Sequence, residues 1–532
     1  MTPNRRTFLK QVGLGVVGIS MMSALPESVM AQETVRRHLP RSTPEAQGVS
    51  SVELLAFLDA VAKSDSEFHS FMLIRHGHIV AEGWWSPYAA DLNHMLYSLS
   101  KSFTSTAIGF AVTEGRLTVD DPVISFFPDK LPETVSDNLA ALKIKHLLTM
   151  SAGHAKDSSH EIQKTGDWVR NFLAYPSANP PGSVFLYNSG ESYMLSAIVQ
   201  KVTGQRVIDY LRPRLFGPLD ITGMTWETCP RGINTGGWGL ALTTEAIAKF
   251  GLFYLHKGKW NGKQLLPAAW VEEATTFKIQ QPPSAGQTLE DAKKNSEWHQ
   301  GYCYQFWRTR HNAFRGDGAM GQYCIVMPDQ DAIIAVTGES GNMAGEFELF
   351  WGHLLSAMKE GTLPPDVNAQ AQLQQRLASL ALMPPKVQSA SPIISQISGK
   401  KYTIMGNSNV ASVVFKFHGD KCRFTLSDDQ GEHSITCGIE HWVDGASDMP
   451  GTPPKVSINP LPPIQKVKAS GTWLDANTFQ MTWRFYETPH HDTVTCHFDG
   501  DRVRVTYLNS ITEKKWQGHD ETRVPLDGLI VA

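Results

Sequence analysis

The sequence predicts an α/β domain of mixed helices and strands, followed by a smaller domain of antiparallel strands. Between about residues 40 and 360, helical and strand patterns alternate along the chain. After residue 392, short segments alternate apolar and polar residues one by one, as half-buried strands do. A Gln-, Ala- and Leu-rich stretch bracketed by Pro-Pro pairs, at 361–392, predicts a linker. We therefore expect domains at 32–360 and 393–532.

The first 31 residues predict an export signal. Arg5 and Arg6 precede Phe-Leu-Lys, an apolar stretch follows from Val12 to Leu25, and Val-Met-Ala at 29–31 offers small residues for a signal peptidase. The paired arginines resemble the twin-arginine type, so we expect the twin-arginine machinery as an export partner and a periplasmic or secreted protein. The alternatives are an ordinary hydrophobic helix or a membrane anchor, but this stretch is shorter than the roughly 20 residues that span a bilayer.

Composition limits the functions that are open to the chain. Of its 532 residues, 41% are hydrophobic and 19% are charged, which is ordinary for a globular protein. Without the first 31 residues, 45 Lys and Arg face 51 Asp and Glu, a formal net charge of −6, so nothing favours nucleic acid as a partner. No later segment is apolar enough to span a membrane, and we expect a soluble mature protein.

The cysteines and histidines form no metal or disulfide pattern in the sequence. Six cysteines are spread from Cys229 to Cys496 without a Cys-x-x-Cys pair. His490 and His491 follow a proline in a predicted turn, and we interpret them as surface histidines rather than a pair of metal ligands. We therefore expect neither a cofactor nor a metal ion.

Individual elements can be predicted from local patterns. Residues 70–85 read as two strands about a His-Gly turn, and residues 243–258 have apolar residues at helical spacing with a glycine at the end. In the second domain, Phe479, Met481, Trp483 and Phe485 are expected on one face of a strand, with Gln, Thr and Arg between them on the other.

The Ser-x-x-Lys spacing, in which an amine can take the proton of a serine hydroxyl, occurs three times. Ser398 and Lys401 stand at the entrance of a predicted strand, where side chains three apart point to opposite faces. Ser356 lies in a predicted helix, and its lysine stands near the end of that helix, where a positive charge suits the helix dipole. Only Ser98 and Lys101 remain as a candidate nucleophile and base.

Ser98 and Lys101 stand at the start of a predicted helix that runs to Gly115. There the lysine lies one turn from the serine on the same face, and free backbone N–H groups are close to the serine oxygen. To act as a base, Lys101 has to be neutral, and burial would lower its pKa from the free value of about 10.4. The alternative reading of Ser98 is a simple helix N-cap.

Two further segments could complete such a site. Tyr187 and Ser189 lie in a turn before a helix that Gly204 ends, where a second hydroxyl could relay protons, although ordinary packing is the alternative. Gly316 and Gly318 stand at a predicted edge strand or its entrance, where an absent Cβ lets the backbone approach a ligand and donate an N–H. The alternative for these glycines is a glycine-rich hairpin.

These three elements, in this order, resemble the penicillin-recognising serine hydrolases. That group includes class C β-lactamases, D-alanyl-D-alanine carboxypeptidases, esterases and aminohexanoate-oligomer hydrolases. The segments at 142–154, 236–271 and 301–323 also look like this family, and the resemblance covers roughly residues 40–360. It implies an antiparallel sheet flanked by helices and an acyl-enzyme mechanism without a cofactor. The C-terminal β domain looks like the tail that some members carry.

The resemblance also implies roles for single residues. The nucleophile falls on Ser98, the lysine on Lys101 and the proton-shuttling tyrosine on Tyr187. The Lys-Thr-Gly strand of the family falls on Gly-Asp-Gly at 316–318, where Gly316 and Gly318 would border the substrate, and a second oxyanion N–H would come from Ala319.

Two departures from the family pattern bear on the substrate. Ser189 replaces the Asn of the Tyr-x-Asn motif, as in the nylon-oligomer hydrolase branch, and Gly316 replaces the cation that helps to hold a substrate carboxylate. Arg315 is adjacent, but strand alternation should aim it, with Asp317, at the opposite face. We therefore expect a small neutral ester or amide substrate. The alternatives are a β-lactamase or D-amino-acid peptidase, and a non-catalytic protein that binds cell-wall fragments.

Overall fold

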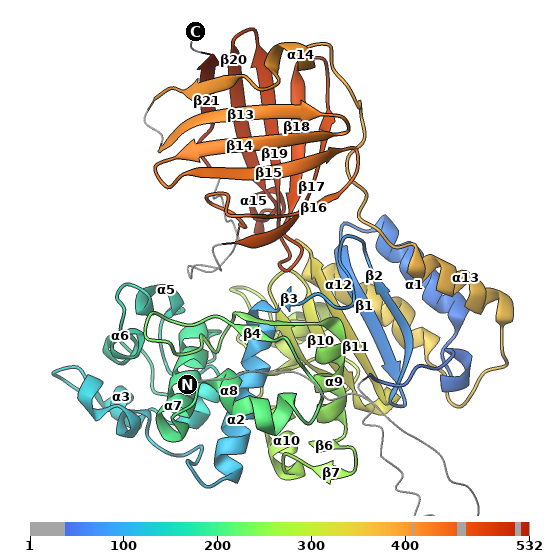
Figure 1. Cartoon of the computed structure of the whole chain (residues 1–532). Helices are drawn as coiled ribbons and strands as arrows, with labels where there is room; N and C mark the ends of the chain where they lie inside the picture. Colours follow the sequence, from blue (N-terminus) through green and yellow to red (C-terminus); the bar gives the residue numbers. More distant parts are fainter. Residues whose placement is uncertain (1–37, 407–408, 455–463, 517–522, 531–532) are drawn as a thin grey trace, which may run out of the picture. The chain divides into compact units, whose positions relative to one another are not determined.

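The computed structural model describes residues 38–406, 409–454, 464–516 and 523–530 (Figure 1). The predicted export signal at 1–31 lies outside these residues. Within them, no helix has both the length and the apolar character needed to cross a membrane. The six cysteines are all buried and none is in a disulfide.

An antiparallel six-stranded sheet forms the centre of the first domain. Its strand order is β2-β1-β11-β10-β9-β8, with β2 at His78–Trp84, β1 at Glu67–Arg75, β11 at Ala332–Glu339, β10 at Gln322–Met327, β9 at Phe314–Gly318 and β8 at Trp307–Arg308. The predicted hairpin at 70–85 is confirmed by β1 and β2, which meet at a His76-Gly77 turn with positive φ at both residues. The short β8 pairs with Phe314 and Arg315 of β9.

Helices cover both faces of this sheet, because its buried strands carry apolar side chains on both sides. In β11, Ile333 and Ala335 belong to one core and Ile334 and Val336 to the other. The first core packs against α2 (Ser100–Thr113), α7 (Ser189–Thr203), α9 (Thr244–Leu255) and α10 (Ala268–Thr275), and the second against α1 (Ser51–Lys63) and α12 (Met343–Leu349). The helix predicted at 243–258 is confirmed by α9, and Gly204 ends α7 as expected.

Shorter elements complete the first domain. The helices are α3 (Asp137–Ala141), α4 (Ile144–Leu148), α5 (Ser159–Ile162), α6 (Trp168–Ala174), α8 (Val207–Leu211) and α11 (Leu289–Asn295). A small sheet has the order β3 (His94–Met95), β5 (Leu240–Leu242) and β4 (Thr225–Trp226), and β6 (Lys259–Trp260) pairs with β7 (Lys263–Gln264). The small sheet is important for the site because β3 leads directly into the segment that carries Ser98.

The C-terminal domain is a closed barrel in which neighbouring strands are antiparallel except at one seam. In barrel order the strands are β15 (Glu432–Ile439), β14 (Lys421–Asp428), β13 (Val410–His418), β12 (Lys401–Ile404), β21 (Leu526–Ile530), β20 (Arg502–Asn509), β19 (His491–Asp499), β18 (Thr478–Arg484) and β17 (Gln465–Trp473). A short parallel pairing of β15 with β17 closes the barrel, and β16 (Val443–Ser447) pairs with β17. The antiparallel β domain predicted from the sequence is confirmed.

Large apolar side chains fill the barrel, as the alternation along β18 predicted. Phe479, Met481 and Trp483 are fully buried, and Trp473 of the neighbouring strand lies with them in the same core. Arg484 points to the outside of the barrel and yet is also buried, with only 5% of its surface exposed, because it contacts the first domain.

The segment predicted as a linker contains helix α13 (Val367–Ala378), which packs against α1. Leu373 and Leu380 are buried in the same core as Phe57 of α1 and Trp85. After this segment the chain passes through α14 (Ile394–Ile397) into the barrel. Helix α15 (Ser510–Glu513) directly follows strand β20 of the barrel. At least part of the predicted linker therefore contributes to the hydrophobic core of the first domain.

We expect Leu373→Ala to lower the free energy of unfolding of the first domain by about 2–5 kcal/mol, because it leaves a cavity in a packed core. Val367→Ala is the matched control in the same helix, since Val367 is 72% exposed. Urea denaturation followed by tryptophan fluorescence measures both. Equal midpoints for the two variants would contradict the packing of α13 on the domain.

Candidate active site

Ser98 lies in a tight 3-10 turn, Tyr97–Leu99, that leads into α2. The turn is held at both ends: Leu96 N–H donates to the Leu240 carbonyl at 2.9 Å, and the Ser100 hydroxyl donates to the Tyr97 carbonyl at 2.6 Å. Ser98 itself is partly exposed, whereas its neighbours are buried. We expected Ser98 within the first turn of the helix, and the structure places it just before the helix begins at Ser100.

Lys101 is close to both the predicted nucleophile Ser98 and Ser189. Its Nζ lies 3.0 Å from Ser98 Oγ, 3.0 Å from Ser189 Oγ and 2.8 Å from the Gly237 carbonyl oxygen. Burial lowers the pKa of Lys101 to about 7, although the carboxylates of Asp157 and Asp317 act in the opposite direction. A neutral amine can accept a proton from Ser98 Oγ, so this arrangement provides a base at the serine.

Tyr187 is held on the other side of the lysine by aromatic contacts. Its ring stacks on Trp307 with centroids 5.6 Å apart, and Lys101 Nζ lies 4.9 Å from its centroid. Burial raises the pKa of Tyr187, while a hydrogen bond with Ser98 opposes that shift. The tyrosine is therefore a neutral phenol next to the serine, and it can give up a proton only to a strong acceptor.

The turn that carries Tyr187 and Ser189 is fixed by Asn188. Its side chain accepts from the N–H of Gly190 at 3.0 Å and from the Ser158 hydroxyl at 2.9 Å, so it caps α7 and ties this helix to a second segment. The Ser189 N–H donates to Asp157 at 3.1 Å. The sequence analysis did not single out Asn188 or Asp157, although an Asn before a helix is a recognisable cap signal.

Gly316 and Gly318 of β9 allow this strand to contact the turn Tyr97–Leu99, which carries the predicted nucleophile Ser98 and is called the nucleophile turn below. A Cβ at Gly316 would lie 2.4 Å from Leu99 Cδ1, and one at Gly318 would lie 2.1 Å from the Leu96 carbonyl oxygen. We expected these glycines to admit a ligand, and in the structure the close contact is with the turn that carries Ser98.

Ala319 follows β9 in a tight turn. Among the described residues, the backbone N–H groups of Ser98 and Ala319 donate no hydrogen bond to the protein. Both donors are therefore free for a ligand oxygen, as the two N–H groups of an oxyanion hole have to be.

Arg315 points away from the glycine face of β9. Its guanidinium is fully buried, pairs with Asp317 at 3.0 Å and lies 4.7 Å from the centroid of the Phe347 ring. Trp298 donates to the same Asp317 oxygen at 3.1 Å. The prediction that strand alternation aims Arg315 and Asp317 to the opposite face from Gly316 is confirmed, so Arg315 does not replace the missing cation.

Comparison with known proteins identifies the family. The family model for β-lactamases matches residues 66–349, which is more than half of the chain. The chain belongs to the β-lactamase family. As a member of this family it is a serine hydrolase with the β-lactamase fold, and the resemblance seen in the sequence is confirmed.

Three β-lactamase relatives indicate how distant the similarity is. The 6-aminohexanoate-dimer hydrolase of Paenarthrobacter ureafaciens is 24% identical over 284 residues, 50% of this chain and 71% of that protein. A β-lactamase of Escherichia coli is 26% identical over 136 residues, 25% of this chain and 35% of the relative. The solved octameric penicillin-binding protein homologue from Pyrococcus abyssi is 15% identical with a TM-score of 0.45, covering 90% of this chain and 99% of that one.

The other two Ser-x-x-Lys pairs of this β-lactamase homologue form no comparable site. Ser356 and Lys359 are exposed, and Lys359 Nζ donates to the Ser356 carbonyl and pairs with Glu53 at 3.2 Å. Ser398 ends helix α14, and its hydroxyl accepts the N–H of Phe417. Neither lysine donates to the hydroxyl of its serine, so the spacing alone does not create the pair.

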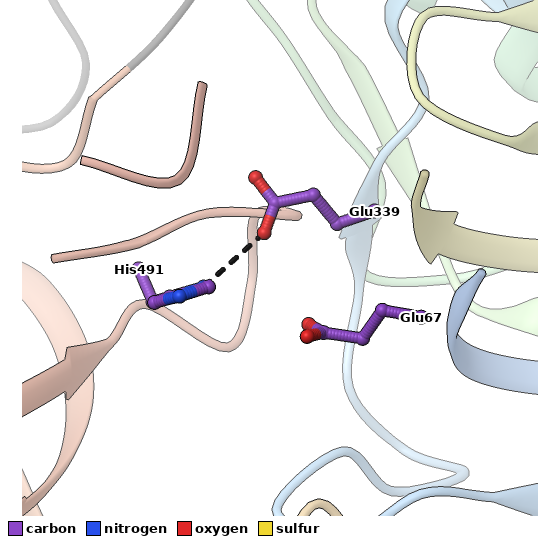
Figure 2. Close-up of side chains that lie close together, drawn as sticks. All are labelled: Glu67, Glu339 and His491. Atoms are coloured by element: carbon purple, nitrogen blue, oxygen red, sulfur yellow. Dashed lines mark ion pairs between the residues drawn. The ribbon is translucent and has the colours of Figure 1, made fainter. Parts of the chain in front are cut away.

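The prediction of surface histidines at 490 and 491 was wrong. His490 has no exposed surface and His491 is 8% exposed, because both contact Glu339 of β11. Figure 2 shows Glu339 and His491 side by side, with Glu67 close to them. No local pattern predicts this burial, since Glu339 stands 151 residues before His490 in the chain.

Glu67, Glu339 and His491 also have the composition of a metal site, with ligand atoms within 4.8 Å of one another. However, Arg484 Nη1 already lies 2.7 Å from Glu67. Although burial lowers the pKa of His491, its hydrogen bonds to Glu339 and Glu513 raise that pKa to about 9. The imidazolium and the guanidinium thus neutralise these carboxylates, and the cluster is an ion-pair network that needs no metal ion.

We expect the rate at which a fluorophosphonate modifies the protein to rise with pH around a midpoint near 7, because Lys101 accepts the serine proton only when it is neutral. Asp157→Asn should move that midpoint to lower pH, since the carboxylate stabilises the ammonium. Asp501→Asn, in an exposed hairpin of the barrel, is the control. Stopped-assay rates from pH 5 to 10 give the profile, and an upward shift for Asp157→Asn would contradict this account.

Proposed function

We propose that the protein is an exported hydrolase that cleaves a neutral ester or amide bond through an acyl-enzyme on Ser98. The observation that carries the proposal is the 3.0 Å hydrogen bond between Lys101 Nζ and Ser98 Oγ, made by an amine whose pKa burial lowers to about 7. At neutral pH a substantial fraction of this amine is unprotonated, so the base needs no further activation.

In the proposed reaction, Lys101 accepts the proton of Ser98 as Oγ attacks the substrate carbonyl carbon. The N–H groups of Ser98 and Ala319 donate to the oxygen that becomes negative. Tyr187 and Lys101 together deliver the proton to the leaving alcohol or amine as its bond to carbon breaks. Water then attacks the acyl carbon, gives one proton to Lys101, and releases the acid while Ser98 regains its proton.

The charges around Ser98 support a neutral substrate. Gly316 stands where related enzymes have a cation, and Arg315 is buried behind the strand and paired with Asp317. Asp157 accepts the Ser189 N–H beside the lysine, so a negative charge lies near the site. A β-lactam or a peptide with a terminal carboxylate would meet repulsion here rather than an ionic partner, which disfavours the β-lactamase and D-amino-acid peptidase alternatives.

We expect intact mass spectrometry to show one fluorophosphonate adduct on the wild-type protein and none on Ser98→Ala, because Ser98 is the proposed nucleophile and its hydroxyl lies 3.0 Å from Lys101 Nζ. Lys101→Met should slow the reaction by about 10²–10⁴-fold, the usual contribution of a general base. Ser356→Ala is the matched control from another Ser-x-x-Lys pair and should label normally.

The same proteins mixed with p-nitrophenyl butyrate separate catalysis from binding alone. Release of nitrophenol that Ser98→Ala abolishes supports the hydrolase. No adduct and no release on the wild type would favour the non-catalytic binder of cell-wall fragments, and an adduct that survives Ser98→Ala would mean that another serine is the nucleophile.

We also propose that the protein reaches the periplasm by the twin-arginine route, on the basis of Arg5 and Arg6 and the apolar stretch after them. Replacement of both arginines by lysine should leave the precursor in the cytoplasm of a bacterial host, as judged by cell fractionation and immunoblotting. Unchanged export of the double-lysine variant would contradict this route.

A further inference from the structure

We propose that the barrel domain completes the active site, with His490 as a positioning residue that holds the nucleophile turn through Tyr97. This inference rests on the proposed role of Ser98. It assigns a function to the C-terminal domain, for which the sequence analysis offered only a likeness to the tail of some relatives.

Tyr97 is the residue directly before Ser98, and its backbone is strained. Its φ of 45° lies in the left-handed region, which costs a residue with a Cβ on the order of 1 kcal/mol. Such a conformation persists only where the surroundings fix it. Tyr97 is 4% exposed, so its own side chain is enclosed by protein.

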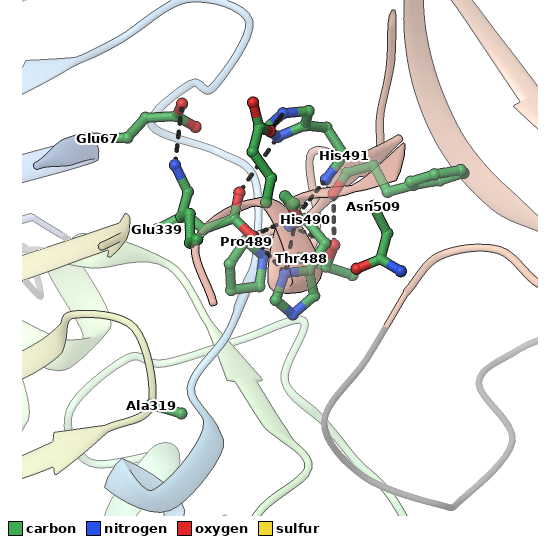
Figure 3. Close-up of polar contacts among 12 residues, drawn as sticks. Glu67, Ala319, Glu339, Thr488, Pro489, His490, His491 and Asn509 are labelled. Atoms are coloured by element: carbon green, nitrogen blue, oxygen red, sulfur yellow. Dashed lines mark hydrogen bonds and ion pairs between the residues drawn. The ribbon is translucent and has the colours of Figure 1, made fainter. Parts of the chain in front are cut away.

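The hydroxyl of Tyr97 is held by the barrel. It lies 2.5 Å from His490 Nε2. His490 Nδ1 in turn lies 2.6 Å from a carboxylate oxygen of Glu339, and both of these residues are labelled in Figure 3. Ser510 of the barrel donates to the same oxygen at 2.5 Å. The loop between β18 and β19 therefore reaches the first domain at the residue next to the nucleophile.

The Glu339 carboxylate fixes the hydrogen on Nδ1 of His490. Although burial would raise the pKa of Glu339, His490 and His491 hold that pKa well below its usual value, so Glu339 is a carboxylate. Nδ1 of His490 then carries the hydrogen that Glu339 accepts, and Nε2 is hydrogen-bonded to the Tyr97 hydroxyl. Carboxylate, imidazole and hydroxyl follow one another as in a catalytic triad. Here no substrate can reach them, because His490 and Tyr97 are buried, and the chain serves to orient Tyr97.

The same loop also binds Met95, which precedes Leu96 as Tyr97 follows it. The Met95 N–H donates to the carbonyl of Glu487 in the loop at 3.0 Å. Residues 95 and 97 are thus both bound to the barrel, while residue 96 is bound to Leu240 of the first domain. Because Tyr97 directly precedes Ser98, the barrel contributes to the placement of the Ser98 hydroxyl and N–H.

A second buried chain leads from the barrel toward the same strand. Arg484 pairs with Glu67 at 2.7 Å, and Glu67 contacts His69 at 3.0 Å. His69 then contacts His94 at 2.9 Å, and His94 Nδ1 lies 3.0 Å from the Met95 carbonyl. Two polar chains, through His490 and through Arg484, therefore end at the residues that precede Ser98, which is the observation that favours positioning over simple domain attachment.

The test uses Tyr97→Phe, which removes only the hydroxyl that His490 binds, and His490→Gln. Lys466→Met is the matched control, because the exposed Lys466 side chain donates to the Glu487 carboxylate of the same loop at 2.8 Å and belongs to neither polar chain. All are full-length proteins, and circular dichroism and melting temperature establish that each is folded at the assay temperature. The readouts are kcat and KM for p-nitrophenyl butyrate and the rate of fluorophosphonate labelling at Ser98.

We expect Tyr97→Phe and His490→Gln to lower kcat and the labelling rate by about 10–100-fold with little change in KM, because a misplaced nucleophile affects the reaction more than binding. The double variant should be no slower than the slower single one, since both break one chain. Lys466→Met should stay within twofold of the wild type.

The outcomes separate this inference from the proposed function. If the wild type is labelled at Ser98 and Tyr97→Phe reacts at the same rate, the positioning role is overturned while the hydrolase stands. If Lys466→Met is as slow as Tyr97→Phe, the loop acts only through general stability and the inference also fails. If the wild type is not labelled at Ser98, the proposed function itself is wrong.

Discussion

The burial of one amine is the interaction on which the proposed chemistry depends. Lys101 Nζ lies within hydrogen-bond distance of Ser98 Oγ, Ser189 Oγ and the Gly237 carbonyl oxygen, and 4.9 Å from the centroid of the Tyr187 ring. In water this amine would be protonated at neutral pH and could not accept the serine proton. Because burial lowers its pKa to about 7, a substantial fraction of this amine is neutral at neutral pH, as the proposed role of a base requires.

The nucleophile turn is placed by parts of the chain that are distant in sequence. Gly316 and Gly318 let β9 approach Leu99 and Leu96, β5 binds the backbone of Leu96, and the barrel binds the residues on either side of it. A turn with a strained residue next to the nucleophile needs such support, because its own local hydrogen bonds do not determine φ at Tyr97. Side chains from both domains can therefore affect a reaction that takes place in only one.

The fold classes of both domains could be predicted from the sequence. So could the grouping of Ser98, Lys101 and Tyr187 in one candidate site, because local spacing and the order of three motifs carry that information. The sequence did not predict that Gly237 and Asp157 contact Lys101 and Ser189, since these contacts join segments that no periodicity connects. His490 was predicted on the surface because Pro-His-His reads as a polar turn. Its burial follows from Glu339, 151 residues earlier in the chain, and only a tertiary structure reveals such a pair.

The most direct test of the central claim is a crystal structure of the wild-type protein after reaction with a fluorophosphonate. The account predicts phosphorus bonded to Ser98 Oγ, with one phosphoryl oxygen about 2.7–3.1 Å from the backbone nitrogens of both Ser98 and Ala319. Lys101 Nζ should remain within hydrogen-bond distance of Oγ, as in the free protein. A phosphoryl oxygen directed away from these two N–H groups, or an adduct on a different residue, would contradict the account.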